Sequence, residues 1–361
     1  MKLALVLVIL VAIAAGVVEW ANAAWDVAGP PAAKGTQTVV LIPPGSRTHA
    51  VAGLLEHQGV IRLGQVFELD LRLRGLSGKI KAGEYAVPSR ASMAAIAKIL
   101  VDGKSIQHKF TAAEGLTSDM IWKLAGADPV LAGDAGPVPQ EGSLLPETYL
   151  FTRGETRIHL LDKMAKAQQA YLNQLWPGRA QDLPFHTMRE AVILASIVEK
   201  ETSLPEERRH IAAVFVNRLR IGMRLQTDPT VIYGLTHGYP LGRGIRQSEL
   251  DRATPYNTYV IAGLPPRPIC NPGKDSLAAV LGPEQSDDLF FVASGHGGHL
   301  FAATISQQAR NVAAYRAFER GVVPESRQVE NNGRADGAAI TVLDPSLPRL
   351  PPAVRRKKVR H

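Results

Sequence analysis

An uncharged apolar run near the N-terminus constrains the topology of this chain more than any other feature. It extends from Leu3 to Val18, directly after Met1 and Lys2. These sixteen residues span about 24 Å as a helix, which is short of a bilayer core of about 30 Å unless the following Ala and Trp residues extend the run. We therefore predict a transmembrane anchor or a signal segment over residues 1–24. Ala21-Asn22-Ala23 fits the small-x-small pattern of a cleavage site, so both alternatives stay open.

The rest of the chain has the composition of a protein that folds in water. Of its 361 residues 20% are charged, and the mean hydropathy is −0.02, which argues against a polytopic membrane protein and against wholesale disorder. The length exceeds one ordinary domain of about 100 to 200 residues and predicts two. By the positive-inside rule, Lys2 stays in the cytoplasm and the bulk of the chain is exported.

Cysteine, charge and histidine usage exclude several kinds of site. The single cysteine, Cys270, rules out an intramolecular disulfide and a cysteine-rich metal centre. The net charge is +8, but residues 355–361 contribute five of these charges. The folded part is then only mildly basic, and no nucleic-acid partner is expected. His296 and His299 lie at an expected hairpin turn and need not face the same side, so neither a metal nor a cofactor is expected.

The first domain is predicted at residues 36–110, after a Pro-, Ala- and Gly-rich linker at 25–35. Alternating or β-branched segments predict strands, and apolar stripes predict helices. The expected strands are 38–42 and 80–87, and the expected helices are 48–58, 67–73 and 92–101. This small α+β module has no cluster of residues suited to catalysis, so it is either a spacer or a binding module.

The second domain, residues 111–322, is predicted to be larger and helix-rich. Ala191–Glu201 and Glu207–Arg220 follow the period of helices, and segments 289–293 and 300–304 predict a hairpin. Beyond Val322 the residues are mostly Pro, Gly, Asn, Arg and Ala, which predicts a disordered basic tail at 323–361. The expected fold class is therefore α+β, with an N-terminal anchor, a small module and a helix-rich catalytic domain.

Glu201 lies on the apolar face of its predicted helix. With about 100° per residue and Leu194 set at 0°, Ile197 falls near 300° and Glu201 near 340°, whereas Glu199 falls near 140°. Burial and the negative end of the helix dipole disfavour a carboxylate there, so the pKa of Glu201 should rise, as a general acid requires. Because Pro205 stops the helix soon after, the alternative is a solvated residue at a fraying helix end.

Two other charged residues each have two interpretations. Arg218 points into the apolar stripe of its helix and needs a carboxylate or carbonyl partner, or a stem that reaches water, and we favour a structural ion pair. Asp228 directly precedes Pro229, which suits the first position of a helix. Asp228 is then either an N-cap residue or a second catalytic carboxylate.

A stiff loop with aromatic and amide side chains is a candidate sugar-binding surface. It contains Tyr256, Asn257 and Tyr259 and leads into Gly263-Leu264-Pro265-Pro266. Aromatic rings beside hydrogen-bonding groups suit a sugar ring, although Tyr-Asn pairs also occur in ordinary loops. Two earlier segments have a similar composition and leave the same alternatives, with Glu141, Glu147 and Tyr149 as their candidate residues.

Several stretches of the second domain resemble the YceG-like family, endolytic peptidoglycan lytic transglycosylases of bacterial inner membranes. They stand in the family's order and are Ala195–Thr202, Val216–Leu219 with Leu225–Gly234, Tyr256–Tyr259 with Gly263–Pro266, and Phe291–Ala293. The resemblance extends over roughly residues 36–320. It implies a LysM-like module at 36–110 and a catalytic domain at 111–322.

The resemblance also implies roles for individual residues. Glu201 corresponds to the essential glutamate of the family. The residues expected to bind the glycan are Glu141, Glu147, Tyr149, Thr202, Asn217, Gln226, Asp228, Tyr256, Asn257 and Tyr259. The sequence departs from the family's pattern where Ser143 stands in place of an aromatic residue and Glu147 in place of the more frequent Asp.

The activity implied is cleavage of the β-1,4 bond between MurNAc and GlcNAc inside glycan strands. Glu201 would act first as acid and then as base, leaving 1,6-anhydro-MurNAc ends and terminating glycan elongation. The implied setting is a single-pass protein of the bacterial inner membrane with its catalytic domain in the periplasm and peptidoglycan synthases as candidate partners. Two rivals stay open: a hydrolytic muramidase with Asp228 or Glu147 as second carboxylate, and a non-catalytic peptidoglycan-binding scaffold of the synthesis machinery.

Overall fold

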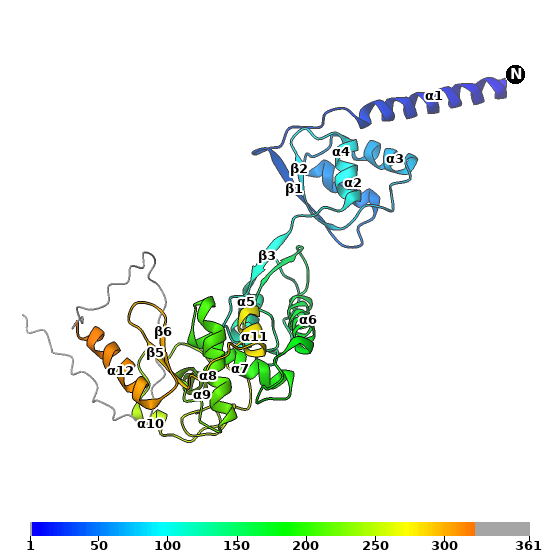
Figure 1. The fold of residues 1–361 in the computed structure, drawn as a ribbon. Helices are drawn as coiled ribbons and strands as arrows, with labels where there is room; N and C mark the ends of the chain where they lie inside the picture. Colours follow the sequence, from blue (N-terminus) through cyan, green and yellow to red (C-terminus); the bar gives the residue numbers. More distant parts are fainter. Residues whose placement is uncertain (1, 322–361) are drawn as a thin grey trace, which may run out of the picture. The chain divides into compact units, whose positions relative to one another are not determined.

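The computed structural model of the chain describes residues 2–321 (Figure 1). The tail expected at 323–361 lies outside the described residues. The chain divides into two compact units, of which the first comprises the residues up to Phe110 together with Pro129–Ala132 and Leu150–Glu155. The sequence assigned these two short segments to the second domain.

Helix α1, Lys2–Trp25, contains the uncharged apolar run. Within the part of the chain that the structure describes, no helix combines the length and the apolar character needed to cross a membrane. The anchor or signal segment at residues 1–24 stays a prediction. At the end of α1, Trp25 is buried and its ring stacks on that of Phe67 with a centroid distance of 6.0 Å, so this end of the helix packs on the first unit.

The first unit is an α+β module built on one antiparallel pair of strands. Strands β1 (Gln37–Ile42) and β2 (Gly83–Pro88) pair with Val40 opposite Tyr85. Helices α2 (Thr48–His57), α3 (Gly64–Leu73) and α4 (Met93–Asp102) share one apolar core with the strands. The expected strands and helices are present, but β2 begins three residues later than the alternating pattern suggested and α3 begins three residues earlier than expected.

The second unit is helix-rich. Strands β3 (His108–Thr111) and β4 (Thr148–Phe151) form a two-stranded sheet. The predicted hairpin is present as β5 (Phe290–Ala293) and β6 (His299–Ala302), with Phe291 opposite Phe301. The helices are α5 (Ser118–Ala127), α6 (Arg157–Leu175), α7 (Met188–Glu201), α8 (Arg208–Arg220), α9 (Asp228–Thr236), α10 (Gln247–Leu250), α11 (Lys274–Leu281) and α12 (Ile305–Glu319), with short 3-10 turns η1 (Trp176–Gly178) and η2 (Pro205–Glu207).

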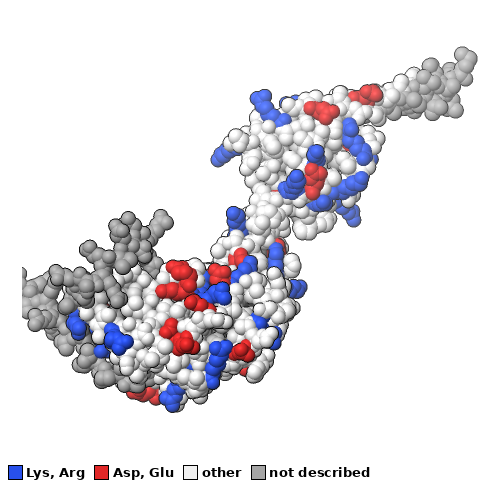
Figure 2. Space-filling view, viewed as in Figure 1, with Lys and Arg blue, Asp and Glu red and all other residues white. Residues whose placement is uncertain are grey.

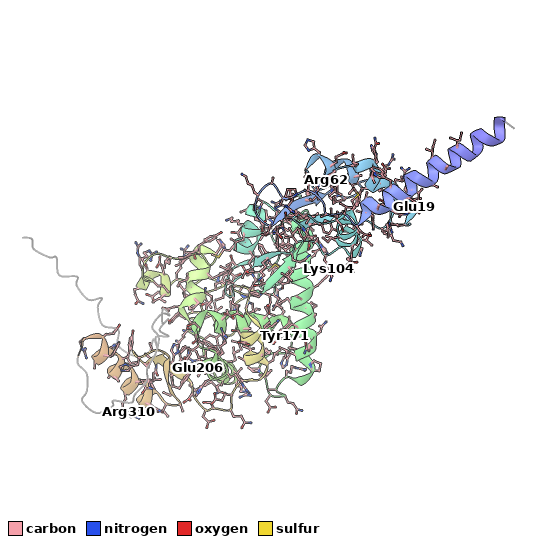
Figure 3. The ribbon with its side chains drawn as sticks, turned by 90° about the horizontal axis from the view of Figure 1, so that it is seen from above. Glu19, Arg62, Lys104, Tyr171, Glu206 and Arg310 are labelled. Carbon is pink, nitrogen blue, oxygen red and sulfur yellow. The ribbon has the colours of Figure 1, made fainter. Side chains whose placement is uncertain are left out.

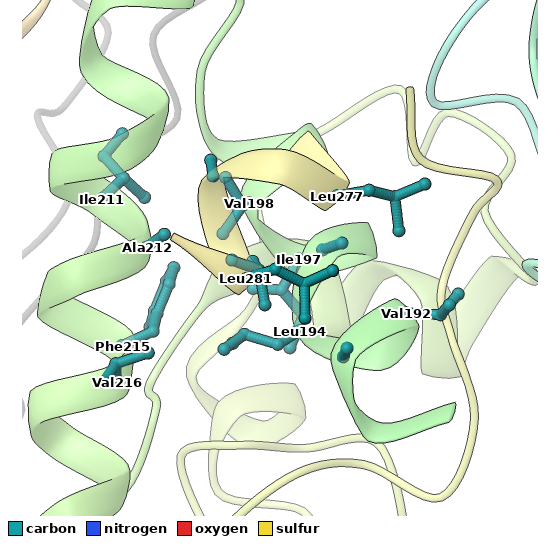
Figure 4. Packing of buried hydrophobic residues seen from close by; sticks show 14 of the residues in the cluster. Val192, Leu194, Ile197, Val198, Ile211, Ala212, Phe215, Val216, Leu277 and Leu281 are labelled. Carbon is teal, nitrogen blue, oxygen red and sulfur yellow. The ribbon is translucent and has the colours of Figure 1, made fainter. Parts of the chain in front are cut away.

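Helices α7, α8 and α11 form the centre of the second unit (Figure 4). Their inward side chains belong to one buried apolar cluster, which includes Leu194, Ile197, Val198, Ile211, Phe215, Leu277 and Leu281. The predicted apolar stripes of α7 and α8 both contribute to this cluster, and α11 supplies the third side. The cluster fixes the C-terminal end of α7, where Glu201 lies.

Candidate active site

Glu201 is the last residue of α7, and its side chain faces the interior. The helix begins with a capping box, in which the Thr187 hydroxyl accepts a hydrogen bond from the Glu190 N–H and the Glu190 carboxylate accepts one from the Thr187 N–H. At the other end of α7, only 2% of the Glu201 surface is exposed. The predicted placement on the apolar face is confirmed, and the alternative of a solvated helix end is wrong.

The two carboxyl oxygens of Glu201 have different surroundings. The Thr227 hydroxyl donates a short hydrogen bond to Oε1. Oε2 is buried and has no hydrogen-bond partner among the described residues. Burial raises the pKa of Glu201 to about 8, with a further increase from the charge of Asp228, while the hydrogen bond from Thr227 and the charge of Arg218 act in the opposite direction. Its surroundings therefore favour the protonated carboxyl.

Arg218 is buried in the apolar stripe of α8, as the sequence predicted. Its Nε donates to the carbonyl oxygen of Leu289 (2.6 Å) and a terminal nitrogen donates to that of Leu225 (2.7 Å). Two carbonyl oxygens thus hold the guanidinium, which lies 5.5 Å from the centroid of the Phe290 ring. The bond to Leu225 ties α8 to the segment that leads to α9, and the bond to Leu289 ties it to the residue before β5.

That segment presents Thr227 to Glu201. Gln226 has a φ of 52°, an uncommon conformation for a residue with a side chain, and its N–H donates to the Thr258 carbonyl (3.1 Å). The N-cap residue of α9 is Thr227, and Asp228 is the first residue of the helix. The N-cap interpretation of Asp228 was therefore wrong. Pro229 takes the second helical position, not the first.

Asp228 lies beside Glu201 and is half-buried. The Tyr259 hydroxyl donates a hydrogen bond of 2.6 Å to its Oδ1. Two predicted residues from separate motifs thus meet at the start of α9. Asp228 acts on Glu201 as a neighbouring negative charge, which disfavours ionisation of the buried acid.

Asn257 holds its own loop together. Its side chain is buried, and the amide nitrogen donates to the carbonyl oxygens of Glu249, Leu250 and Arg252 at 2.7 to 3.2 Å. Its Oδ1 accepts from the Tyr259 N–H at 3.0 Å. Of the two alternatives for this loop residue, the structure favours the brace, because each polar atom of the amide is already bonded within the protein.

A second polar group joins Glu141, Tyr233 and Tyr256. The Tyr233 hydroxyl donates to Oε2 of Glu141 (3.2 Å), and the Tyr233 and Tyr256 ring centroids are 4.9 Å apart. Glu141 Oε1 accepts from the Ser118 N–H (2.8 Å) at the start of α5, and burial raises the pKa of this carboxyl. Tyr233 was not among the predicted site residues. The available signal was its place in the matched stretch Leu225–Gly234.

The Glu199 side chain projects from a different side of α7 than the Glu201 side chain, as the helical geometry predicted. Its Oε2 accepts from the Gly273 N–H (2.9 Å) and the Ser276 hydroxyl (2.7 Å), at the N-terminus of α11. Oε1 lies 3.8 Å from a terminal nitrogen of the buried Arg208. This glutamate therefore joins three helices, whereas Glu201 faces Thr227.

Comparison with known proteins decides the family. Residues 40–314 match the YceG-like family. This chain belongs to that family.

Two curated relatives carry the same name. The YceG-like chain is 28% identical over 320 residues to the endolytic murein transglycosylase of Bacillus subtilis (strain 168), which covers 79% of this chain and 87% of that protein. It is 28% identical over 323 residues to the endolytic murein transglycosylase of Streptococcus pneumoniae serotype 2 (strain D39), which covers 76% of this chain and 57% of that protein. This chain thus spans little more than half of the Streptococcus relative.

A solved structure is also similar. The crystal structure of a YceG-like protein from Listeria monocytogenes matches 77% of this chain and 99% of that chain, with 28% sequence identity and a TM-score of 0.45.

Other predicted site residues of this YceG-like protein make structural contacts. Asn217 donates to the Ser286 carbonyl (2.6 Å), and the buried Tyr149 hydroxyl donates to the Leu145 carbonyl (2.8 Å). Thr202, next to Glu201, accepts from the Leu204 N–H (3.0 Å). The structure does not bond any of these three to Glu201.

Glu147 pairs with Lys274, whose ammonium group lies 5.8 Å from the centroid of the Tyr171 ring. Tyr171 belongs to α6 (Figure 3). Acidic and basic side chains are interspersed on the surface of the second unit, as Figure 2 shows. The Glu147 carboxylate thus belongs to a surface ion pair, which is worth little in stability.

A surface cavity of about 620 Å³ lies along the first half of α7 in the YceG-like protein. It is lined by Arg189, Glu190 and Ile193 of the helix and by the predicted stiff segment Gly263–Pro266. Glu201, at the far end of α7, is not part of its lining.

The two histidines and the cysteine have other surroundings. His299 Nδ1 lies 2.7 Å from Glu207 Oε2 in an ion pair, and His296 packs against Phe318. Within residues 2–321 no group of three or more His, Cys, Asp and Glu side chains is placed to hold a metal ion. Cys270 is buried, which raises the pKa of its thiol.

Proposed function

We propose that this protein is an endolytic murein transglycosylase that uses Glu201 as its single acid and base. The observation that carries the proposal is a buried carboxyl with a raised pKa. The sequence resemblance equates this residue with the essential glutamate of the family. The printed names of the Bacillus and Streptococcus relatives support the same reaction class. The substrate is a peptidoglycan glycan strand.

The reaction needs no second carboxylate. Glu201 donates its proton to the glycosidic oxygen as the bond between MurNAc C1 and that oxygen breaks. The 6-hydroxyl of the same MurNAc then bonds to C1, and its proton goes to the Glu201 carboxylate. A pKa of about 8 keeps the acid protonated before the first transfer, and intramolecular attack gives a proximity advantage over water.

The environments of the rival carboxylates favour this mechanism over hydrolysis. Asp228 accepts a hydrogen bond from Tyr259, and Glu147 pairs with Lys274 on the surface. A hydrolytic muramidase requires one of them to activate a water molecule or to attack the sugar. The scaffold alternative gives no reason for an acid with a raised pKa to remain buried, since a buried unpaired carboxyl disfavours folding at neutral pH.

Digestion of purified glycan strands by the full chain tests the proposal. Mass spectrometry should find new ends that are one water lighter than reducing ends. Glu201→Gln should remove this product, because an amide can neither donate the proton nor take it back. Glu206→Gln is the matched control, because Glu206 is an exposed glutamate five positions further along (Figure 3). Reducing ends would support the muramidase, and undiminished cleavage by Glu201→Gln would refute the proposal.

The proposed cellular role is to terminate glycan elongation in the periplasm, from an N-terminal anchor in the inner membrane and beside peptidoglycan synthases. Endolytic cleavage of a growing strand separates it from the site of synthesis. Cells whose only copy carries Glu201→Gln should therefore make longer glycan strands. Chromatography of strand lengths measures the effect, and fractionation of cells with protease accessibility tests the location.

A further inference from the structure

Thr227 is the direct partner of the Glu201 carboxyl in this structure. It is completely buried, and its hydroxyl donates to Oε1 of Glu201. Thr227 is also the N-cap residue of α9, a position where a threonine side chain usually accepts a hydrogen bond from the first helical turn. Here the side chain makes no such cap. The hydroxyl is therefore directed to the carboxyl at the expense of its usual structural role.

The backbone of Thr227 is fixed by two other buried threonines. Its N–H donates to Thr258 Oγ1 (3.0 Å), and its carbonyl oxygen accepts from the Thr230 hydroxyl (2.8 Å). The Thr230 and Thr258 hydroxyls are themselves 2.8 Å apart. All three residues have no exposed surface. Thr227 consequently has little freedom to turn its hydroxyl away from Glu201.

The two carboxyl oxygens of Glu201 are distinguished by this contact. A hydroxyl has one hydrogen, and Thr227 directs it to Oε1, so Oε1 acts as an acceptor. With Thr227 as the donor, the proton of the neutral carboxyl sits on Oε2, a buried oxygen that has no hydrogen-bond partner among the described residues. We propose that Thr227 is a positioning residue that reserves Oε1 as an acceptor and thereby makes Oε2 of Glu201 the oxygen that gives and takes back the proton.

This inference rests on the proposed function and specifies which oxygen of Glu201 transfers the proton. The Oε2 proton moves to the glycosidic oxygen as the bond from that oxygen to C1 breaks. The new bond forms between C1 and the 6-oxygen of the same sugar, whose proton returns to Oε2. Thr227 keeps its hydrogen throughout, and its bond to Oε1 is strongest while Glu201 is a carboxylate.

Three variants test the assignment in the full chain. Thr227→Val keeps the shape and removes the hydroxyl, Thr227→Ala removes it without adding bulk, and Thr227→Ser retains it. Val and Ala should each lower kcat for glycan cleavage roughly 10- to 100-fold, the scale of a hydrogen bond to a charged group, with KM little changed. Ser should restore most of the rate.

The pH profile separates positioning from a merely structural role. The hydrogen bond from Thr227 lowers the pKa of Glu201, so Val and Ala should move the alkaline limb of the kcat profile to higher pH, and Ser should leave it in place. The other charged groups that act on Glu201 are Asp228 of α9 and Arg218 of α8, and the variants leave both unchanged. Wild-type rates in Val and Ala, or slow variants with an unmoved limb, would overturn the inference.

A readout without activity keeps this inference separable from the proposed function. Glutamate carboxyl ¹³C NMR, with Glu201→Gln to assign the signal, gives the pKa of Glu201 directly in the wild type and in Thr227→Ala. A higher pKa in the variant supports the hydrogen-bond assignment even if the chain cleaves no glycan. An unchanged pKa overturns it even if cleavage is normal.

Discussion

The Tyr259 hydroxyl donates a hydrogen bond of 2.6 Å to Oδ1 of Asp228, the first residue of α9. This bond gives the Asp228 carboxylate a hydrogen-bond donor from the loop that contains Tyr259. The anion lies close enough to Glu201 to raise its pKa. Asp228 is therefore a positioned negative charge beside an acid whose pKa it raises.

Asp228→Asn should lower the pKa of Glu201 while preserving most of the local packing. Removal of the neighbouring negative charge favours ionisation of Glu201, so the alkaline limb of the pH profile for cleavage should move to lower pH. At about pH 6, where Glu201 stays protonated, the variant should remain active. Loss of all cleavage at every pH would instead indicate that Asp228 is a second catalytic carboxylate, as in a muramidase.

Glu201→Gln should change how stability depends on pH. The pKa of Glu201 is about 8 in the folded chain and about 4.5 when unperturbed. Below pH 4.5 both the folded and the unfolded chain bind this proton, so its stabilising contribution is fully present. Between 4.5 and 8 only the folded chain binds it, and stability falls by up to about 1.4 kcal/mol per pH unit.

The glutamine variant lacks this contribution, so it should become progressively more stable than the wild type as the pH rises. Urea unfolding of both proteins at about pH 5 and about pH 8 measures the difference. Parallel pH dependences would show that Glu201 is not a buried acid in the folded chain.

Asn257→Ala should destabilise the protein more than it affects chemistry at the cleaved bond. Its amide bonds three carbonyl oxygens and one N–H in a buried loop, and unpaired buried groups cost about 1–3 kcal/mol. The melting temperature should fall by several degrees. Residual activity measured well below that temperature should stay near normal. A large loss of turnover with an unchanged melting temperature would instead indicate that Asn257 binds the glycan.

Glu199→Ala should weaken the docking of α11 without removing the acid. It deletes the acceptor for Gly273 and Ser276 and leaves the buried Arg208 with fewer acidic neighbours. We expect a loss of about 1–3 kcal/mol in the free energy of unfolding. Glu199→Gln retains one oxygen acceptor and should lose less. If Glu199→Gln abolished cleavage in a folded protein, the division of roles between the two glutamates would be wrong.

The sequence predicted the features that depend on helical periodicity. A period of 3.6 residues placed Glu201 and Arg218 on apolar faces, and both are buried. The same geometry directed Glu199 elsewhere, where it contacts α11. These predictions succeed because the face of a helical residue follows from its own segment alone.

Features that depend on contacts distant in the sequence were not predicted. Thr227 reaches Glu201 because Gln226 adopts a positive φ and because Thr258 holds the backbone, and neither can be read from local pattern. Asp228 is a residue type that is common at the N-cap, but the N-cap residue of α9 is Thr227, one position earlier. The Asn257 amide donates to carbonyl oxygens at the end of α10 and just after it, and these partners likewise could not be read from local pattern. Helix α12 was missed because it buries only Gln308 and Val312 and so lacks a clear apolar stripe.

The separation between Glu201 and Thr227 has a consequence for when the protein can act. The two residues are 26 positions apart and meet only after α9 has docked against α7. Before that, Glu201 is an ordinary glutamate in water and is ionised at neutral pH, so it has no proton to give. Under the proposed mechanism, a newly made or unfolding chain therefore cannot cleave glycan strands, and cleavage becomes possible only in the completed fold.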